Sequence, residues 1–259
     1  MKSAKQVDRA GVLVVAGVAL YAVCLVITAP ASMMAWAIAY ASERKVILEQ
    51  PEGGLWRGHA GNIGVDPRGD GVQRFGKVSW KVAPLRLVVG ELRIEVKAEG
   101  SANGTGTVIL RPQSIRMLQA RFAVSALSMA SFFPTLQFVQ PGGEVVLKTD
   151  DIVFGGNTIA GKAEAMWSDA STPFAAVKPL GTYRATAEST QGPAQLEVST
   201  VAGALQINGR GTWSPETGFD FSGVARAAPA EAARLRDLLR LLGRADENGN
   251  HAFRYPVRS

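Results

Sequence analysis

The sequence of 259 residues has little of what metal centres and histidine-dependent catalysis require. Its single cysteine excludes a disulfide within the chain and a cysteine-rich zinc site. Its two histidines, His59 and His251, leave little material for a histidine metal site or for acid–base catalysis. Only 19% of the residues are charged, and the net charge of +6 is spread along the chain without a dense basic and aromatic patch. The composition therefore does not indicate a nucleic-acid partner.

Motifs of catalysis and nucleotide binding are also missing or incomplete. The chain has no H-x-x-x-H and no G-x-S-x-G. Residues 71–77 and 156–162 begin like a P-loop, but each lacks the Ser or Thr that would hold Mg²⁺. Residues 246–250 resemble a calcium loop without its Gly and its final Glu, so that a turn rich in Asp and Asn is predicted. We predict no catalytic, cofactor-binding or metal-binding residues, and hence no enzyme.

The longest apolar run lies near the N-terminus. No charged residue occurs between Arg9 and Glu43, and residues 10–28 carry almost no polar side chain. As a helix this run would be about 28 Å long, close to the hydrocarbon thickness of a bilayer. The preceding Lys2, Lys5 and Arg9 favour a cytoplasmic N-terminus. We predict a single-pass protein of the inner membrane, with a cytoplasmic tail over residues 1–9, a transmembrane helix over 10–28, a membrane-proximal segment over 29–44 and a periplasmic β-domain over 45–259.

Two alternatives concern this region. Residues 29–31 have the small-x-small form of a cleavage site, but the apolar run is longer than the about 7–15 residues of a signal peptide, and Pro30 makes a poor site. We therefore predict an anchor that is not cleaved. The segment 29–44 either leads the helix out of the membrane, as Trp36 and Tyr40 indicate, or begins a core helix, as the i, i+3, i+4, i+7 spacing of its apolar residues indicates.

After Ser42 the hydropathy pattern changes to period two. Apolar and charged residues alternate without a fault over residues 92–99, which predicts an antiparallel strand with one buried and one wet face. Similar runs recur at residues 77–82, 107–111, 119–124, 144–147, 159–167, 182–188, 195–198, 204–213 and 219–225. Turn residues separate them, and long helical runs between strands are missing. The fold class is therefore mainly β, with one large, curved antiparallel sheet in an open barrel or sandwich-like arrangement.

Two short helices are predicted within this β-domain. Ser125 can cap residues 126–133, and Pro134 would end that helix. Residues 229–242 form the second, with Pro229 in its first turn. Its leucines make one stripe, while Arg236 and Arg240 lie off it. The stripe predicts a helix packed on the sheet, and the two arginines are a possible interaction face for a membrane surface or a partner.

Several ordered landmarks resemble one known family, the type II secretion system protein N family, also called general secretion pathway protein N. The first is a G-x-L-W-x-G element, the second a W-x-x-x-P-x-x-L-x-x-G pattern, and the third and fourth are an L-G-x-Y element and a G-x-L-x-x-x-G strand. Their fixed positions here are Gly53, Leu55, Trp56, Gly58, Trp80, Pro84, Gly90, Leu180, Gly181, Tyr183, Gly203 and Gly209. The resemblance covers nearly the whole chain, although no single motif is specific.

The resemblance implies an accessory inner-membrane component of the type II secretion system. Its partners would be other secretion subunits, in the inner-membrane assembly or the secretin, and its mechanism would be association. The motif residues themselves are expected to be structural, because glycines mark turns and close contacts and tryptophans fill cores. The alternative is a lipid-binding or tethering protein that resembles AsmA-type envelope proteins, with an apolar groove between its strands. A chaperone-like module is a third, weaker interpretation.

Overall fold

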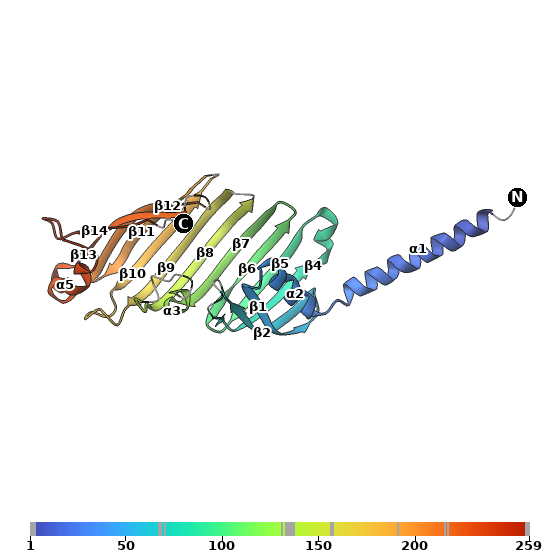
Figure 1. The fold of residues 1–259 in the computed structure, drawn as a ribbon, viewed down its shortest axis with the longest axis horizontal. Coiled ribbons are helices and arrows are strands. Elements are labelled where there is room, and N and C mark those ends of the chain that lie inside the picture. The colour runs from blue at the N-terminus through green and yellow to red at the C-terminus, as the bar shows by residue number, and fades with distance from the viewer. Residues whose placement is uncertain are drawn as a thin grey trace.

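The computed structural model describes residues 4–66, 69, 71–130, 132, 138–155, 158–190, 192–214, 216 and 218–256, without the side chains of residues 4–10, Val23, Val88 and Pro256. One open antiparallel sheet of 14 strands dominates the fold, and helices are few (Figure 1). The strands pair in chain order from β1 to β14, and only the two-residue β3 lies off this path, against β2. The sheet is thus a meander, in which neighbours along the chain are neighbours in space.

The strands are β1 (Val46–Gly53), β2 (Arg57–Val65), β3 (Gln73–Arg74), β4 (Lys77–Ala83), β5 (Leu92–Glu99), β6 (Ala102–Arg111), β7 (Ser114–Ser125), β8 (Gly142–Gly155), β9 (Thr158–Ser171), β10 (Gly181–Ser189), β11 (Ala194–Gly203), β12 (Leu205–Ser214), β13 (Gly218–Ala227) and β14 (His251–Pro256). The α-helices are α1 (Ala4–Ile27), α2 (Ala31–Ala41), α3 (Ala126–Ala130) and α5 (Ala232–Arg240). The 3₁₀ helices are η1 (Pro84–Val89) and η2 (Pro229–Glu231).

The predicted large antiparallel sheet is confirmed, in its open form. The sandwich-like alternative is wrong for the described strands, because they pair in one unbroken series instead of dividing into two layers. The strand predicted over residues 92–99 has the same bounds as β5. In contrast, β1, β2, β3 and β14 lie outside the predicted strands. Glycines and a proline interrupt the alternation in β1 and β2.

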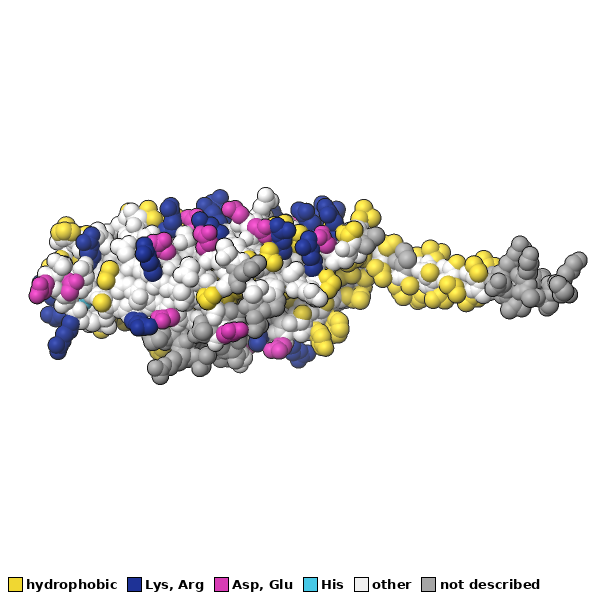
Figure 2. All heavy atoms as spheres, turned by 90° about the horizontal axis from the view of Figure 1, so that it is seen from above, with side chains coloured by type: hydrophobic (Ala, Val, Ile, Leu, Met, Phe, Trp, Pro, Cys, Tyr) yellow, Lys and Arg dark blue, Asp and Glu magenta, His cyan; other side chains and the backbone are white. Residues whose placement is uncertain are grey.

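Alternation along the strands gives the sheet one apolar and one charged face. In β5, Ile94 and Val96 lie on the apolar face, while Glu95 and Lys97 lie on the other. The charged face is crossed by ion pairs between neighbouring strands: Arg116–Asp151, Lys162–Glu188, Arg184–Glu164, Arg210–Glu197 and Arg254–Asp220. Basic and acidic side chains are therefore interspersed over the molecule (Figure 2).

Helices cover both ends of the apolar face. At the N-terminal end, Ala31 and Met34 of α2 pack in the core cluster that contains Trp80. At the C-terminal end, Leu235 and Leu239 of α5 pack in a second cluster with residues of β12 and β13. The segment 29–44 therefore contains a core helix, which was one of its two predicted roles. Between the helices, much of the apolar face of β7–β11 is only half-buried.

The predicted short helices are present. Ser125 caps α3, because its Oγ accepts a hydrogen bond from the N–H of Ser128 at 3.1 Å. Residues 131 and 133–137, including the predicted helix end at Pro134, lie outside the described residues. The predicted helix over 229–242 corresponds to η2 followed by α5.

The N-terminal helix α1 extends away from the sheet (Figure 1). Its large apolar side chains between Val12 and Ile27 are exposed, with exposed fractions of 51% to 72%. None of the helices in the described part of the chain has the length and hydropathy that crossing a membrane requires. The transmembrane helix over residues 10–28 thus stays a prediction.

Candidate functional site

The G-x-L-W-x-G element forms the connection between β1 and β2. Gly53 has a φ of +88°, which disfavours any residue with a Cβ atom. The backbone N–H of Leu55 donates to the carbonyl oxygen of Ala29 at 2.8 Å. The indole Nε1 of Trp56 donates to the carbonyl oxygen of Val26, also at 2.8 Å. The element therefore fastens the junction of α1 and α2 to the first hairpin of the sheet.

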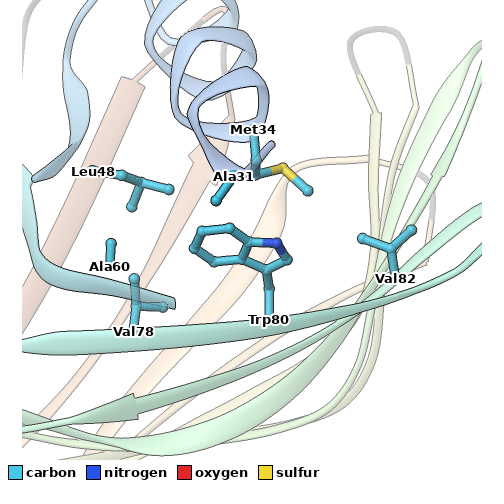
Figure 3. Packing of buried hydrophobic residues seen from close by; sticks show 7 residues of the cluster. All are labelled: Ala31, Met34, Leu48, Ala60, Val78, Trp80 and Val82. Carbon is cyan, nitrogen blue, oxygen red and sulfur yellow. The ribbon is translucent and has the colours of Figure 1, made fainter. Parts of the chain in front are cut away.

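Trp80 of β4 forms the centre of the N-terminal core (Figure 3). Its ring is 5% exposed and lies beneath Met34 of α2. Its Nε1 donates to the carbonyl oxygen of Leu55 at 3.1 Å, which ties the second motif to the first. A Cβ atom at Gly58 would lie 2.7 Å from this indole ring. Gly58 is thus the residue that lets Trp80 lie flat against β2.

The pattern that begins at Trp80 ends in η1. Pro84 stands at its first turn, where a missing N–H costs nothing. Gly90 ends it in the left-handed conformation, with a φ of +73°. Between them η1 exposes Leu85 and Val89, with exposed fractions of 85% and 67%. Pro84 and Gly90 thus bound η1, and Leu85 and Val89 between them form an exposed apolar surface.

The L-G-x-Y element builds the second core cluster. Leu180 is buried there, and the hydroxyl of Tyr183 donates to the carbonyl oxygen of Leu205 at 2.9 Å. The Tyr183 ring lies 5.7 Å from that of Trp167 between centroids. Burial raises the pKa of Tyr183 to about 12. This tyrosine is therefore a buried, neutral hydrogen-bond donor at physiological pH, which joins β10 to β12.

Glycines in this second cluster allow close contacts between strands. Gly181 and Gly203 face each other across β10 and β11, and a Cβ atom at Gly203 would lie 2.2 Å from the Cα of Gly181. Gly203 also has a φ of +140°. In β12, a Cβ atom at Gly209 would lie 2.5 Å from the Phe221 ring. Each glycine thus makes room for a neighbouring strand or ring.

The charge-bearing helix α5 has two different sides. Leu235 is fully buried and Leu239 is 4% exposed, so its leucine stripe packs on the sheet as predicted. Leu242 of the predicted stripe lies beyond the helix end and is 40% exposed. Arg236 and Arg240, the possible interaction face, are both exposed. Their binding to a partner stays a prediction.

The titratable groups near the C-terminus hold local structure. The ring Nδ1 of the buried His251 lies 2.9 Å from the carbonyl oxygen of Gly243. Asp246 accepts the backbone N–H of Asn250 at 2.8 Å, which confirms the predicted turn. Hydrogen bonds from Asn250 lower the pKa of Asp246. Within the described ranges, no three His, Cys, Asp or Glu side chains gather where they could hold a metal ion.

The ordered motifs can now be compared with known proteins. The family profile described as "Type II secretion system (T2SS), protein N" matches residues 44–254. The chain belongs to this family. The resemblance inferred from the sequence is thus confirmed, and no curated protein and no solved structure matches the chain. Membership in the protein N family makes the chain a type II secretion component and implies that it associates with other secretion subunits.

The buried family motifs offer little surface for that association. Trp80, Leu180 and Tyr183 are 5–6% exposed, so a partner cannot reach most of their surface. The open sheet instead offers two terminal strands, β1 and β14, each paired with one neighbour along the main path of the sheet. Neither was among the predicted strands. Periodicity could not reveal β1, because it contains Gln50 in a left-handed conformation beside Pro51.

Proposed function

We propose that this protein is an accessory inner-membrane component of the type II secretion system. It acts by protein–protein association during export of folded proteins across the outer membrane, and it catalyses no reaction. Family membership supports the secretion role. The motif residues support the mechanism, because they build a rigid sheet and leave its edges and charged face for partners.

The edge strand β14 is the proposed contact for another secretion subunit. Residues 251–256 pair with β13 on one side, and His251 also forms an isolated bridge with Ala245. The backbone groups of an edge strand can accept a strand from a partner, here along residues 252–256. At the other end of the sheet, Pro51 lacks an N–H and Gln50 bends β1, which makes that edge a poorer template. The single observation that carries the proposed contact is this open C-terminal edge.

The inner-membrane location is proposed from the N-terminal sequence and from α2. Residues 10–42 carry no charge, and basic residues precede them. On α2, the outward-facing Trp36 and Tyr40 stack with centroids 5.5 Å apart and are 67% and 76% exposed. Tryptophan and tyrosine favour the membrane–water interface. These features support a domain held close to the outer leaflet of the inner membrane.

Removal of the gene tests the proposed function. We expect export of folded proteins to fall, and we expect the full chain supplied in trans to restore it. Normal export and normal assembly of the secretion machine in the deletion strain would contradict the proposal. A reporter active only in the periplasm, fused after Pro256, tests the topology separately; activity is expected, and an inactive reporter on a stably accumulated fusion would contradict it.

A further inference from the structure

The middle of the apolar face contains a floor of four alanines. Ala165 pairs with Ala185, and Ala163 pairs with Ala187, across β9 and β10. All four side chains lie on the face opposite the Arg184–Glu164 ion pair, because neighbouring residues of a strand point to opposite faces. Small side chains on two central strands leave a depression in the apolar face.

Large apolar side chains on both sides turn this depression into a trough of about 680 Å³. Phe122 of β7 and Leu147 of β8 form one wall. Leu196 of β11 and Phe221 of β13 form the other. Phe221 reaches over because Gly209 and Gly211 of β12 leave room for its ring. The trough therefore results from small residues in its floor and large apolar residues in its walls.

The lining is uncharged. Lys148, Glu164 and Glu197 border the trough, but their side chains point to the charged face, because they alternate with Leu147, Ala165 and Leu196 along their strands. The two carboxylates pair there with Arg184 and Arg210. The hydroxyl of Thr149 also borders it, and donates to the carbonyl oxygen of Lys162 at 3.1 Å. A polar occupant would lose its hydration without gaining partners. Complementarity therefore requires an occupant with neither charge nor unpaired polar groups.

The ends of the trough differ. On the same face of β9 and β10, the next pair in one direction is Trp167 and Tyr183, whose bulk ends the alanine floor. In the other direction it is Gly161 and Ser189, whose small size continues the floor toward the hairpin turns. From Gly161 to Ala165 the strand rises about 14 Å. One leaflet of bilayer hydrocarbon is about 15 Å thick, so the floor matches the length of one acyl chain.

The volume of the trough is too small for a protein helix. An α-helix with its side chains is about 10–12 Å across and rises about 5.4 Å per turn, which amounts to roughly 400–600 Å³ per turn. The trough would hold little more than one turn, whereas a helix bound in a groove uses anchors over at least two. A second copy of this chain would present an identical depression, so the walls of the two copies would meet before their floors.

We propose that the trough binds one acyl chain of a membrane phospholipid. The chain lies along the alanine floor between the Leu147 and Leu196 walls. The polar head group stays in water beyond Gly161 and Ser189, past the end of the floor. Phospholipid binding here extends beyond association with secretion subunits, and does not depend on which subunit the protein contacts.

A photoreactive amino acid placed in living cells tests the proposal on the full chain. Benzoylphenylalanine replaces Leu196, on the trough wall, or its neighbour Gln195, which is exposed on the opposite face. After illumination, the mass of the purified protein shows what it has captured. We expect a phospholipid adduct from position 196 and none from position 195. A filling substitution, Ala185→Phe, should reduce the adduct from position 196 about tenfold, which corresponds to about 1.4 kcal/mol.

Other results would overturn the proposal. They are the absence of a phospholipid adduct, equal adducts from both positions, capture of a polypeptide alone, or an adduct that Ala185→Phe leaves unchanged. If the Leu196 variant does not accumulate, Phe221 on the trough wall and Ser222 on the opposite face of β13 form an equivalent pair. Loss of export in the deletion strain is a separate measurement, so the proposed function and the proposed lipid site can fail independently.

Discussion

The indole nitrogen of Trp56 donates a hydrogen bond to the carbonyl oxygen of Val26, at 2.8 Å. This carbonyl lies in the last turn of α1, where helical carbonyls lack partners within the helix. The N–H of Leu55 makes a second link, to Ala29. The G-x-L-W-x-G element thus connects the N-terminal helix to the sheet, thirty residues further along the chain.

Replacing Trp56 with Phe tests this connection. The variant keeps an aromatic ring but removes the hydrogen bond, whose net contribution is about 0.5–1.5 kcal/mol. We expect a non-specific protease to cut faster between α1 and α2, while unfolding of the sheet changes little. The control is Trp36→Phe at an exposed site on α2. Equal cleavage rates in both variants would show that the Trp56 hydrogen bond does not hold the junction.

Trp80 should be among the most sensitive positions of the domain. Trp80→Ala leaves a cavity under α2 and should lower the free energy of unfolding by about 3–5 kcal/mol. Trp80→Phe keeps an aromatic ring in the core and should therefore cost less. Its cost of about 1–3 kcal/mol comes from the Leu55 carbonyl, which loses its hydrogen-bond donor. Denaturant unfolding of the full chain measures both values. A loss below about 1 kcal/mol for Trp80→Ala would contradict the packing in Figure 3.

Gly58 should not tolerate even a methyl group. In Gly58→Ala the new Cβ would lie 2.7 Å from the Trp80 ring and 2.8 Å from the carbonyl oxygen of Glu52. Overpacking of this kind costs about 1–3 kcal/mol. Gly192→Ala is the matched control, since no atom lies within 4 Å of its Cβ position. The difference between their thermal midpoints measures the clash, and equal midpoints would refute it.

Tyr183 should make stability depend on pH in the alkaline range. Burial raises its pKa from 10.0 to about 12, so the folded state holds the phenolic proton to higher pH than the unfolded chain does. Its contribution is complete below about pH 10, and declines by about 1.4 kcal/mol per pH unit between about 10 and 12. Tyr183→Phe should remove this slope, whereas the exposed Tyr40→Phe should keep it. Urea unfolding across this range distinguishes them.

The arginines of α5 should matter for partners and not for the fold. Arg236→Glu combined with Arg240→Glu should leave the thermal midpoint nearly unchanged, because both side chains are exposed. Leu235→Ala, on the buried side, should cost about 2–5 kcal/mol. Co-isolation with secretion subunits should fall in the double variant. Unchanged co-isolation would leave α5 with a packing role alone.

Local patterns predicted the strands whose residues alternate strictly, such as Leu92–Glu99. Local patterns could not predict two other features. The strand β1 is bent at Gln50 and Pro51, so its alternation is broken where α2 and the motif turn meet it. The trough depends on register: Ala165 and Ala185 are unremarkable in sequence, and only their pairing across β9 and β10 creates a floor. Register is a long-range property that periodicity within a strand does not encode.

The family resemblance identified the function more specifically than the chemistry of any single residue did. Individual motifs such as Leu180-Gly181 are too short to be specific, but their order along residues 44–254 identified the family. The structure adds a reason for these motifs: they place Trp80 and Leu180 in two core clusters, one toward each end of the sheet. The buried motif residues leave little of their own surface for a partner, so motif positions alone do not locate the contact.

Photocrosslinking from the open edge tests the association mechanism most directly. Benzoylphenylalanine at Ala252, exposed on β14, is compared in living cells with the same residue at Lys148, exposed on the interior strand β8 and about 29 Å away. We expect the Ala252 variant to capture another type II secretion subunit and the Lys148 variant to capture much less. Capture of no secretion subunit from Ala252, or equal capture from both positions, would contradict association through the β14 edge.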